Sequence, residues 1–297
     1  MRIFLTGATG FIGSRILPEL LAAGHEVLGM TRSEAGARSI EAAGGQPHLA
    51  TLEDIEAIKA GATETDAVIH TAFDHDFSNY AENCTKDARV IAAIGSVLQD
   101  TDRPFLITSA VGLGDPGDGS PAREDVFDAA HPTPRIASEK AGAEFAEAGG
   151  KLIVIRLPQV HDTVRQGLIS PYIDITREKG MAAYIGEGRN SWSAGHVLDV
   201  AKLYALALDK GEPGRRYHAV AEEGVTMREI AEAVGAGLGV PVKSLSPEEA
   251  RDHFGWLSIF AGLDMRTSSA WTRKTLDWTP TGPDLLTDLG NMDYTAG

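Results

Sequence analysis

The glycine-rich stretch "FLTGATGFIGSRILPELLAAG", residues 4–24, constrains the fold of this chain more than any other segment. Its Gly7, Gly10 and Gly13 stand three residues apart, between a short apolar run and an amphipathic segment. Residues without a Cβ atom permit a tight turn and a close approach of backbone to a pyrophosphate, and the N–H groups that open the next helix bind phosphate oxygens. The stretch therefore predicts a strand, a dinucleotide-binding turn and a helix.

The first half of the chain alternates β-rich runs with helical segments. The runs are "RIFLTG", "HEVLGMT", "DAVIHTA", "RPFLITSA" and "KLIVIRLP". This alternation is typical of βαβ units, which form a parallel sheet with helices on both faces. We expect an α/β fold with a Rossmann-type doubly wound parallel sheet and a smaller C-terminal substrate lobe.

The second half is less regular and contains two helix starts with capping boxes. Thr226 stands three residues before Glu229, and Ser246 stands three before Glu249. In each pair the hydroxyl and the carboxylate bond the backbone N–H groups at the start of a helix. The expected divisions are residues 1–157 with 193–220 for the dinucleotide-binding domain, and residues 158–192 with 221–297 for the substrate-binding lobe.

The end of the second β-rich run indicates which dinucleotide is bound. A site that prefers NAD usually has an acidic residue there, which bonds the ribose 2′-OH. This chain has Thr31, Arg32 and Ser33 instead. An arginine and two hydroxyls suit a 2′-phosphate, so we expect NADP(H) to be preferred over NAD(H).

Composition and charge exclude several other classes of function. The net charge of −15 argues against nucleic acid and anionic membranes as partners, because both require a basic surface. The single cysteine, Cys84, excludes an internal disulfide, and the scattered histidines predict no metal site. No apolar run reaches the roughly 18 residues of a membrane span. We expect a cytoplasmic protein that acts on a small molecule.

The spacing GxxGxxG in "TGATGFIG" resembles the extended and atypical short-chain dehydrogenases/reductases, the NAD-dependent epimerase/dehydratase-like group. Further stretches are similar to that family along nearly the whole chain, among them "DAVIHTAF", "FLITSAVGLGD", "VIRLPQVHD", "GHVLDVAKLYALAL" and "SSAWTRKTLDWTP". The resemblance also implies a homodimer. Together with the glycine-rich turn it predicts cofactor contacts from Gly7, Thr9, Gly10, Phe11, Ile12, Gly13, Thr31, Arg32, Ser33, Thr71, Ala72, Phe73, Lys140 and Pro158.

One position departs from the family pattern. The resemblance implies a proton-donating tyrosine four residues before a lysine that binds the nicotinamide ribose and lowers the pKa of the tyrosine. Lys140 matches the lysine, whereas Ile136 stands in the place of the tyrosine. Ser109 falls on the active-site serine. From the residues alone, Lys140 also fits a solvated pair with Glu144, and Ser109 also fits an ordinary turn residue.

Another group must therefore supply the proton if the chain is an enzyme. His75 is the first choice, because it follows the strand that borders the cofactor and an imidazole titrates near neutral pH. His131, His161, Tyr184 and water are the other candidates.

We expect substrate contacts from His161, Tyr184, Trp192 and Trp256. The aromatic residues of the second half fit a packed core as well as they fit the wall of an apolar pocket. The second interpretation suggests a small, moderately apolar carbonyl or imine as the substrate.

Three functions remain open on the sequence. The first is an NADP(H)-dependent oxidoreductase in which Ser109 polarises the acceptor and Lys140 holds the ribose. The second is a non-catalytic NADP-binding redox sensor that regulates a partner protein, which Ile136 favours. The third is an NAD-dependent epimerase or dehydratase, which the missing tyrosine disfavours most because sugar oxidation there needs a phenolate base.

Overall fold

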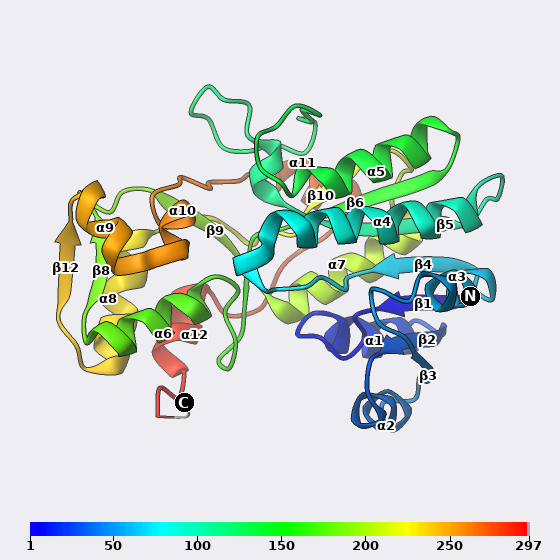
Figure 1. The fold of residues 1–297 in the computed structure, drawn as a ribbon, viewed down its shortest axis with the longest axis horizontal. Helices are drawn as coiled ribbons and strands as arrows, with labels where there is room; N and C mark the ends of the chain where they lie inside the picture. The colour runs from blue at the N-terminus through cyan, green and yellow to red at the C-terminus, as the bar shows by residue number, and fades with distance from the viewer. Residues whose placement is uncertain (296–297) are drawn as a thin grey trace.

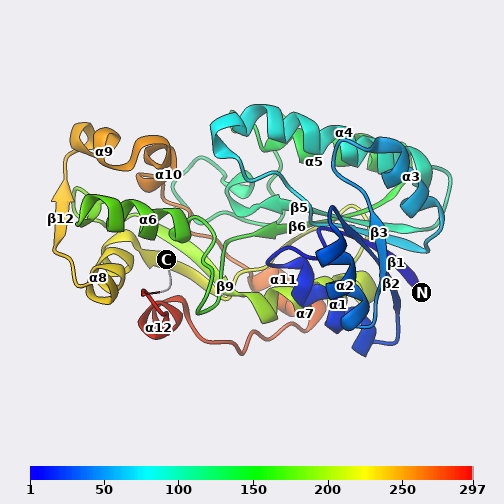
Figure 2. The same cartoon turned by 60° about the horizontal axis from the view of Figure 1, so that its bottom comes forward.

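The computed structural model describes residues 1–295, and in them a seven-stranded sheet lies between two layers of helices (Figures 1 and 2). The strand order is β10-β6-β5-β4-β1-β2-β3, and the pairings are parallel. This arrangement confirms the predicted doubly wound sheet. Its strands are β1 (Arg2–Thr6), β2 (Glu26–Thr31), β3 (Gln46–Leu49), β4 (Ala67–His70), β5 (Pro104–Ala110), β6 (Lys151–Leu157) and β10 (Arg216–His218).

Helices cover both faces of the sheet because successive strand residues point to opposite sides. Ile3 and Leu5 pack with one layer and Phe4 with the other, and all three are fully buried. One layer consists of α1 (Gly13–Ala22), α2 (Glu34–Ala42), α7 (Val197–Lys210) and α11 (Ala270–Leu276). The other consists of α3 (Ile55–Thr63), α4 (Tyr80–Leu98) and α5 (Ile136–Glu147).

The second lobe has its own core and two small sheets, in the orders β11-β9-β7 and β12-β8. Both predicted capping boxes are present, at Thr226 and at Ser246. The strands are β7 (Gln159–His161), β8 (Ala182–Ile185), β9 (Ser191–His196), β11 (Glu222–Thr226) and β12 (Val242–Leu245). The helices are α6 (Ile169–Lys179), α8 (Met227–Leu238), α9 (Pro247–Phe254), η3 (Gly255–Leu257), α10 (Ser258–Ala261) and α12 (Leu285–Asn291).

The lobe lies at the end of the sheet toward which the β4 arrow points in Figure 1. Parallel α/β sheets bind ligands at this carboxyl edge, next to the point where the strand order reverses. Here that point falls between β1 and β4. The residue boundaries expected between domain and lobe stay a prediction. Among the described helices, none is long and apolar enough to cross a membrane.

Candidate cofactor cleft and active site

The glycine-rich turn joins β1 to α1 at the point of strand reversal. Gly7 has a φ of +68°, and a Cβ atom there would lie 2.8 Å from the backbone nitrogen of Ala72. A Cβ atom on Gly13 would lie 2.1 Å from the carbonyl oxygen of Gly7. Both distances are too short for any side chain, so these glycines are required for packing the turn against β4 and against the start of α1.

The start of α1 presents backbone N–H donors that have no acceptor among the described residues. Among residues 1–295, the N–H groups of Phe11 and Ile12 donate no hydrogen bond. The N-cap residue, Ile12, has no side-chain acceptor, and the first turn of the described helix contains no acidic residue. Free N–H groups at the positive end of a helix form an anion site, which fits a dinucleotide pyrophosphate.

The end of β2 has a polar atom that is also unsatisfied. Thr31 is buried, and its hydroxyl has no hydrogen-bond partner in the described part of the chain. The Ser33 hydroxyl is occupied, because it accepts a bond from the Gly36 N–H at 3.1 Å and caps α2. Arg32 and Arg38 are exposed and form no ion pair with any described residue. The Thr31 hydroxyl is packed against Gly36, so the feature that fits a phosphorylated ribose is the free positive charge of Arg32 and Arg38.

The end of β4 is fixed to β1 through the Thr6 hydroxyl. Thr6 Oγ1 accepts bonds from the backbone N–H groups of Thr71 and Ala72, at 3.1 and 3.3 Å. Its own proton is then left for His70 Nδ1, 2.7 Å away. His70 consequently carries its proton on Nε2, where it donates to Asp87 at 2.9 Å. The predicted cofactor residues Thr71 and Ala72 are thus held at the edge of the cleft.

Arg135 places a buried cation at the ends of β4 and β5. Its guanidinium donates to Asp87 at 2.6 Å and to the Thr108 carbonyl at 2.7 Å, and it lies 4.5 Å from the centre of the Phe73 ring. Asp87 also accepts a bond from the Ser138 hydroxyl at 2.6 Å. Burial alone would raise the pKa of Asp87, but the charge of Arg135 and these hydrogen bonds hold it well below its usual range.

A second buried cluster surrounds Glu139, one turn further along α5. Its carboxylate accepts a bond from the Ser109 hydroxyl at 2.6 Å and two bonds from Arg156 at 2.8 and 2.9 Å. Arg216 donates a further bond at 2.8 Å. Although burial acts to raise the pKa of Glu139, the bonds from Arg156 and its charge lower it overall. The Ser109 hydroxyl is therefore already committed to a carboxylate.

The structure does not bring Lys140 and Ser109 together. Lys140 is exposed and has no ion pair or hydrogen bond with any residue that the structure describes, while Ile136 is buried. The side chains that α5 and its N-cap direct at the strand ends are Arg135 and Glu139, one position earlier in each case. A search for a lysine four residues after a missing tyrosine could not detect this pair.

The loop after β4 meets the second lobe in an aromatic cluster. Phe77 stacks on Trp256, with ring centres 4.9 Å apart, and Tyr80 and Phe260 complete the contact. His75 lies beside this cluster and is exposed. Crowding by its neighbours, then the charge of Arg165, lowers the pKa of His75. Of the predicted substrate residues, Trp256 is the one placed at this mouth of the cleft.

The other predicted residues lie deeper in the second lobe or at its base. His161 is fully buried and bonds Asp288 at 2.7 Å, and Trp192 is fully buried in the core of the lobe. Tyr184 is partly buried under Arg228, 5.0 Å from its ring centre. Pro158, between β6 and β7, is half-buried. His131 Nδ1 accepts a hydrogen bond from the backbone N–H of Thr133.

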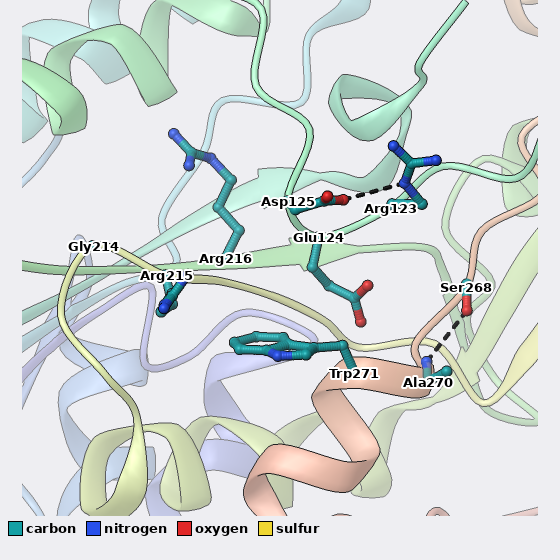
Figure 3. A pocket seen from close by; sticks show the side chains of 9 residues that line it. All are labelled: Arg123, Glu124, Asp125, Gly214, Arg215, Arg216, Ser268, Ala270 and Trp271. Carbon is teal, nitrogen blue, oxygen red and sulfur yellow. Dashed lines mark hydrogen bonds and ion pairs between the residues drawn. The ribbon is translucent and has the colours of Figure 1, made fainter. Parts of the chain in front are cut away.

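A cavity of about 450 Å³ opens elsewhere, between the edge strand β10 and α11 (Figure 3). Three arginines line it, but each is paired with a carboxylate: Arg123 with Asp125, Arg215 with Glu212, and Arg216 with Glu139. Figure 3 shows Trp271 on one side of the space, facing the loop that carries Glu124 and Asp125. Because its charges are already neutralised and it borders the outer strand, this cavity does not fit the dinucleotide.

Comparisons with known proteins agree with this geometry. Residues 3–220 match the NAD dependent epimerase/dehydratase family. An uncharacterised protein of Schizosaccharomyces pombe is 48% identical over 295 residues, which cover 99% of this chain and 100% of that protein. The 4-hydroxy-2-methyl-3-oxo-4-farnesyl-3,4-dihydroquinoline-1-oxide ketoreductase of Stigmatella aurantiaca is 29% identical over 234 residues, 73% of this chain and 67% of that protein. The solved UDP-glucose-4-epimerase of Stenotrophomonas maltophila, with bound NAD and formylated UDP-arabinopyranose, has a TM-score of 0.77 at 18% identity and covers 99% of this chain and 97% of that one.

Proposed function

Because this chain belongs to the NAD dependent epimerase/dehydratase family, as its motifs predicted, we propose that it is an NADP(H)-dependent oxidoreductase of the atypical short-chain type. It would transfer hydride between nicotinamide and a small carbonyl or imine. The observation that carries the proposal is the glycine-rich turn after β1, with the free N–H groups of Phe11 and Ile12, beside the neighbouring strand β2, at whose end Arg32 has no ion pair with a described residue. The ketoreductase relative supports a carbonyl as the acceptor.

The residues at the carboxyl edge of the sheet divide the work of holding the cofactor. The glycine-rich turn binds the pyrophosphate, and Thr31, Arg32 and Ser33 surround the adenosine ribose and its 2′-phosphate. Thr71, Ala72 and Phe73 border the cleft from β4. The nicotinamide supplies the hydride, so the protein has to position the acceptor and deliver or remove a proton.

His75 is our candidate for the proton donor, as the sequence predicted. It follows the end of β4 and contacts the rings of Phe73 and Phe77, and its exposed ring can exchange a proton with solvent. The sequence did not point to Tyr80, which lies in the same cluster in the first turn of α4. Burial raises the pKa of Tyr80, so its phenol keeps its proton and serves as a hydrogen-bond donor to the acceptor oxygen.

One alternative has structural support of its own. Ile136 is buried, Lys140 is exposed and the Ser109 hydroxyl is bound to Glu139, so the usual catalytic set is not assembled. These observations favour a non-catalytic NADP-binding regulator as the second candidate. A regulator of this kind should bind NADPH tightly without transferring its hydride, whereas an oxidoreductase should consume NADPH.

The first test is calorimetric binding of NADPH and NADH to the intact protein and to its Arg32→Ala variant. We expect NADPH to bind more tightly than NADH to the intact protein, and we expect the variant to lose most of that difference. Equal affinity of the intact protein for both would overturn the NADP preference, and failure to bind either would overturn the whole proposal.

The second test follows NADPH absorbance with ketones, aldehydes and cyclic imines. In a reductive reaction His75 has to be protonated, so the rate is expected to fall as pH rises through a pKa below the usual value of about 6.5. His75→Gln should flatten this profile, while Lys140→Ala should leave the rate unchanged. Binding of NADPH without turnover on the whole panel would instead establish the regulator.

A further inference from the structure

We propose that Arg165 of the second lobe binds the pyrophosphate of the dinucleotide, on the side opposite the glycine-rich turn. The inference rests on the proposed binding of NADP(H) and adds a residue that no motif in the chain indicated. It extends the part of the second lobe in the cofactor site beyond Pro158, the lobe residue for which the sequence predicted a cofactor contact.

A tight turn holds Arg165 in place between β7 and α6. His161 and Gln166 form an antiparallel bridge at its base. The Asp162 carboxylate accepts the N–H groups of Val164 and Arg165, each at 2.8 Å, and the Asp162 N–H donates to the Arg165 carbonyl at 3.0 Å. Three bonds therefore fix the backbone at the tip, while the Arg165 side chain extends from it into solvent.

This turn lies against both walls of the cofactor cleft. The Arg165 guanidinium is 5.9 Å from the centre of the Phe11 ring. Phe11 precedes the N-cap of α1, and its N–H is one of the two that donate no bond to the described residues. Arg15, in the first turn of α1, is 3.8 Å from the Asp162 carboxylate. On the other wall, the charge of Arg165 acts on His75, in the loop after β4. Arg165 therefore lies between the turn that cradles the pyrophosphate and the loop that borders it.

The charge of Arg165 is available for a ligand. It forms no ion pair or side-chain hydrogen bond with any of residues 1–295, although the chain has 42 acidic residues and a net charge of −15. Arg189, another exposed arginine of the same lobe, is by contrast paired with Glu187, 2.7 Å away. The Arg165 guanidinium lies near the ring of Phe11, the residue before the N-cap of α1, whose N–H donates no bond to the described residues, and a planar guanidinium matches the geometry of phosphate oxygens.

Two arginines would then recognise different parts of one ligand. Arg32 stands at the end of β2, where only a 2′-phosphate would reach it, so it should distinguish NADPH from NADH. Arg165 faces a group that both dinucleotides share, so it should affect both equally. This difference gives each residue its own signature in binding experiments.

The test compares the intact protein with Arg165→Ala, Arg165→Lys and Arg32→Ala by calorimetry with NADPH, NADH and adenosine 2′-monophosphate. We expect Arg165→Ala to weaken NADPH and NADH alike, roughly tenfold to a hundredfold, since it removes charge-assisted hydrogen bonds. Binding of adenosine 2′-monophosphate, which has no pyrophosphate, should change less than about twofold. Arg165→Lys should recover part of the loss, because lysine keeps the charge but not the bidentate geometry.

Arg189→Ala is the matched control, since it removes another exposed arginine of the same lobe. It should leave all three affinities unchanged, and circular dichroism should show that every variant is folded. Unchanged affinity of Arg165→Ala for both dinucleotides would overturn the inference and leave the proposed function intact. A loss for NADPH alone, or a matching loss for adenosine 2′-monophosphate, would place Arg165 at the adenosine end and also overturn it. An intact protein that binds neither dinucleotide would end both proposals together.

Discussion

The substitution Glu139→Gln tests the energetics of the buried cluster on α5. Glu139 is fully buried and accepts four hydrogen bonds, from Ser109, Arg216 and twice from Arg156. A neutral amide has only one accepting oxygen, and its NH2 group would face a guanidinium. The substitution therefore leaves two arginine charges poorly compensated in the interior, which typically costs about 3–5 kcal/mol. That is a large share of the 5–15 kcal/mol by which a domain is usually stable.

The measurement is the free energy of unfolding in urea at pH 7, followed by circular dichroism, with the slope against urea checked for constancy. Glu212→Gln is the matched control. It breaks an Arg215 pair of 3.2 Å by the same chemical change, but both of its side chains are more than half exposed. Solvent screens such a pair, so the control should lose less than about 1 kcal/mol.

The effect of pH gives a second check with a definite sign. The folded-state pKa of Glu139 is below its usual value, so the contribution of Glu139 to stability is complete above the unfolded pKa of about 4.3. It is lost as pH falls through the lower folded pKa. The difference between the intact protein and Glu139→Gln should thus shrink in acid. A cost below about 1 kcal/mol at pH 7, or a difference that stays constant in acid, would refute a strong buried ion cluster.

Three further substitutions probe other parts of the molecule. Gly13→Ala should abolish NADPH binding in calorimetry, because the new Cβ would lie 2.1 Å from the Gly7 carbonyl; wild-type affinity would contradict the geometry of the turn. Thr226→Ala removes the hydroxyl of a capping box in which both hydrogen bonds are present. The free energy of unfolding in urea should fall by roughly 1 kcal/mol. An unchanged free energy would mean that the capping box does not stabilise the protein. Burial and the charge of Arg156 lower the pKa of His218 to about 3 in the folded protein. Below a pH of about 6.5 the unfolded chain therefore binds a proton at His218 that the folded protein does not, and the free energy of unfolding decreases as pH falls. His218→Gln should reduce the slope of unfolding free energy against pH over that range, and an unchanged slope would show that His218 does not titrate there.

The parts of the fold that sequence predicted are those that short segments determine. The glycine-rich turn can be read locally because a Cβ atom on Gly13 would meet Gly7, six residues earlier, and because Gly7 itself has a φ of +68°, which favours glycine. The capping boxes at Thr226 and Ser246 are also local, since each connects residues three positions apart. Alternation of strands and helices then leaves few arrangements other than a doubly wound sheet.

The active site could not be read in the same way, because its partners come from distant segments. Ser109 and Glu139 are 30 residues apart, and Arg135 and Asp87 are 48 apart. A shift of one residue on α5 turns a side chain by about 100°, so the family pattern centred on Ile136 and Lys140 did not indicate that Arg135 and Glu139 are directed at the strand ends. The spacing of apolar residues on a helix as short as α5 does not predict on which face two charged side chains will be buried.

Arg135 and Glu139, the charged side chains that the start of α5 directs at the strand ends, differ in chemistry from a tyrosine and lysine pair. A phenol and a lysine work because one loses a proton while the other stays charged and exposed to the cofactor. Arg135 and Glu139 are instead each bound to an opposite charge, at 2.6 and 2.8 Å, and neither can exchange a proton near neutral pH without leaving its partner buried and uncompensated. They stabilise the strand ends and position Phe73 beneath a cation. Under the proposed function we therefore expect proton transfer to involve His75 and Tyr80, which contact the same aromatic cluster.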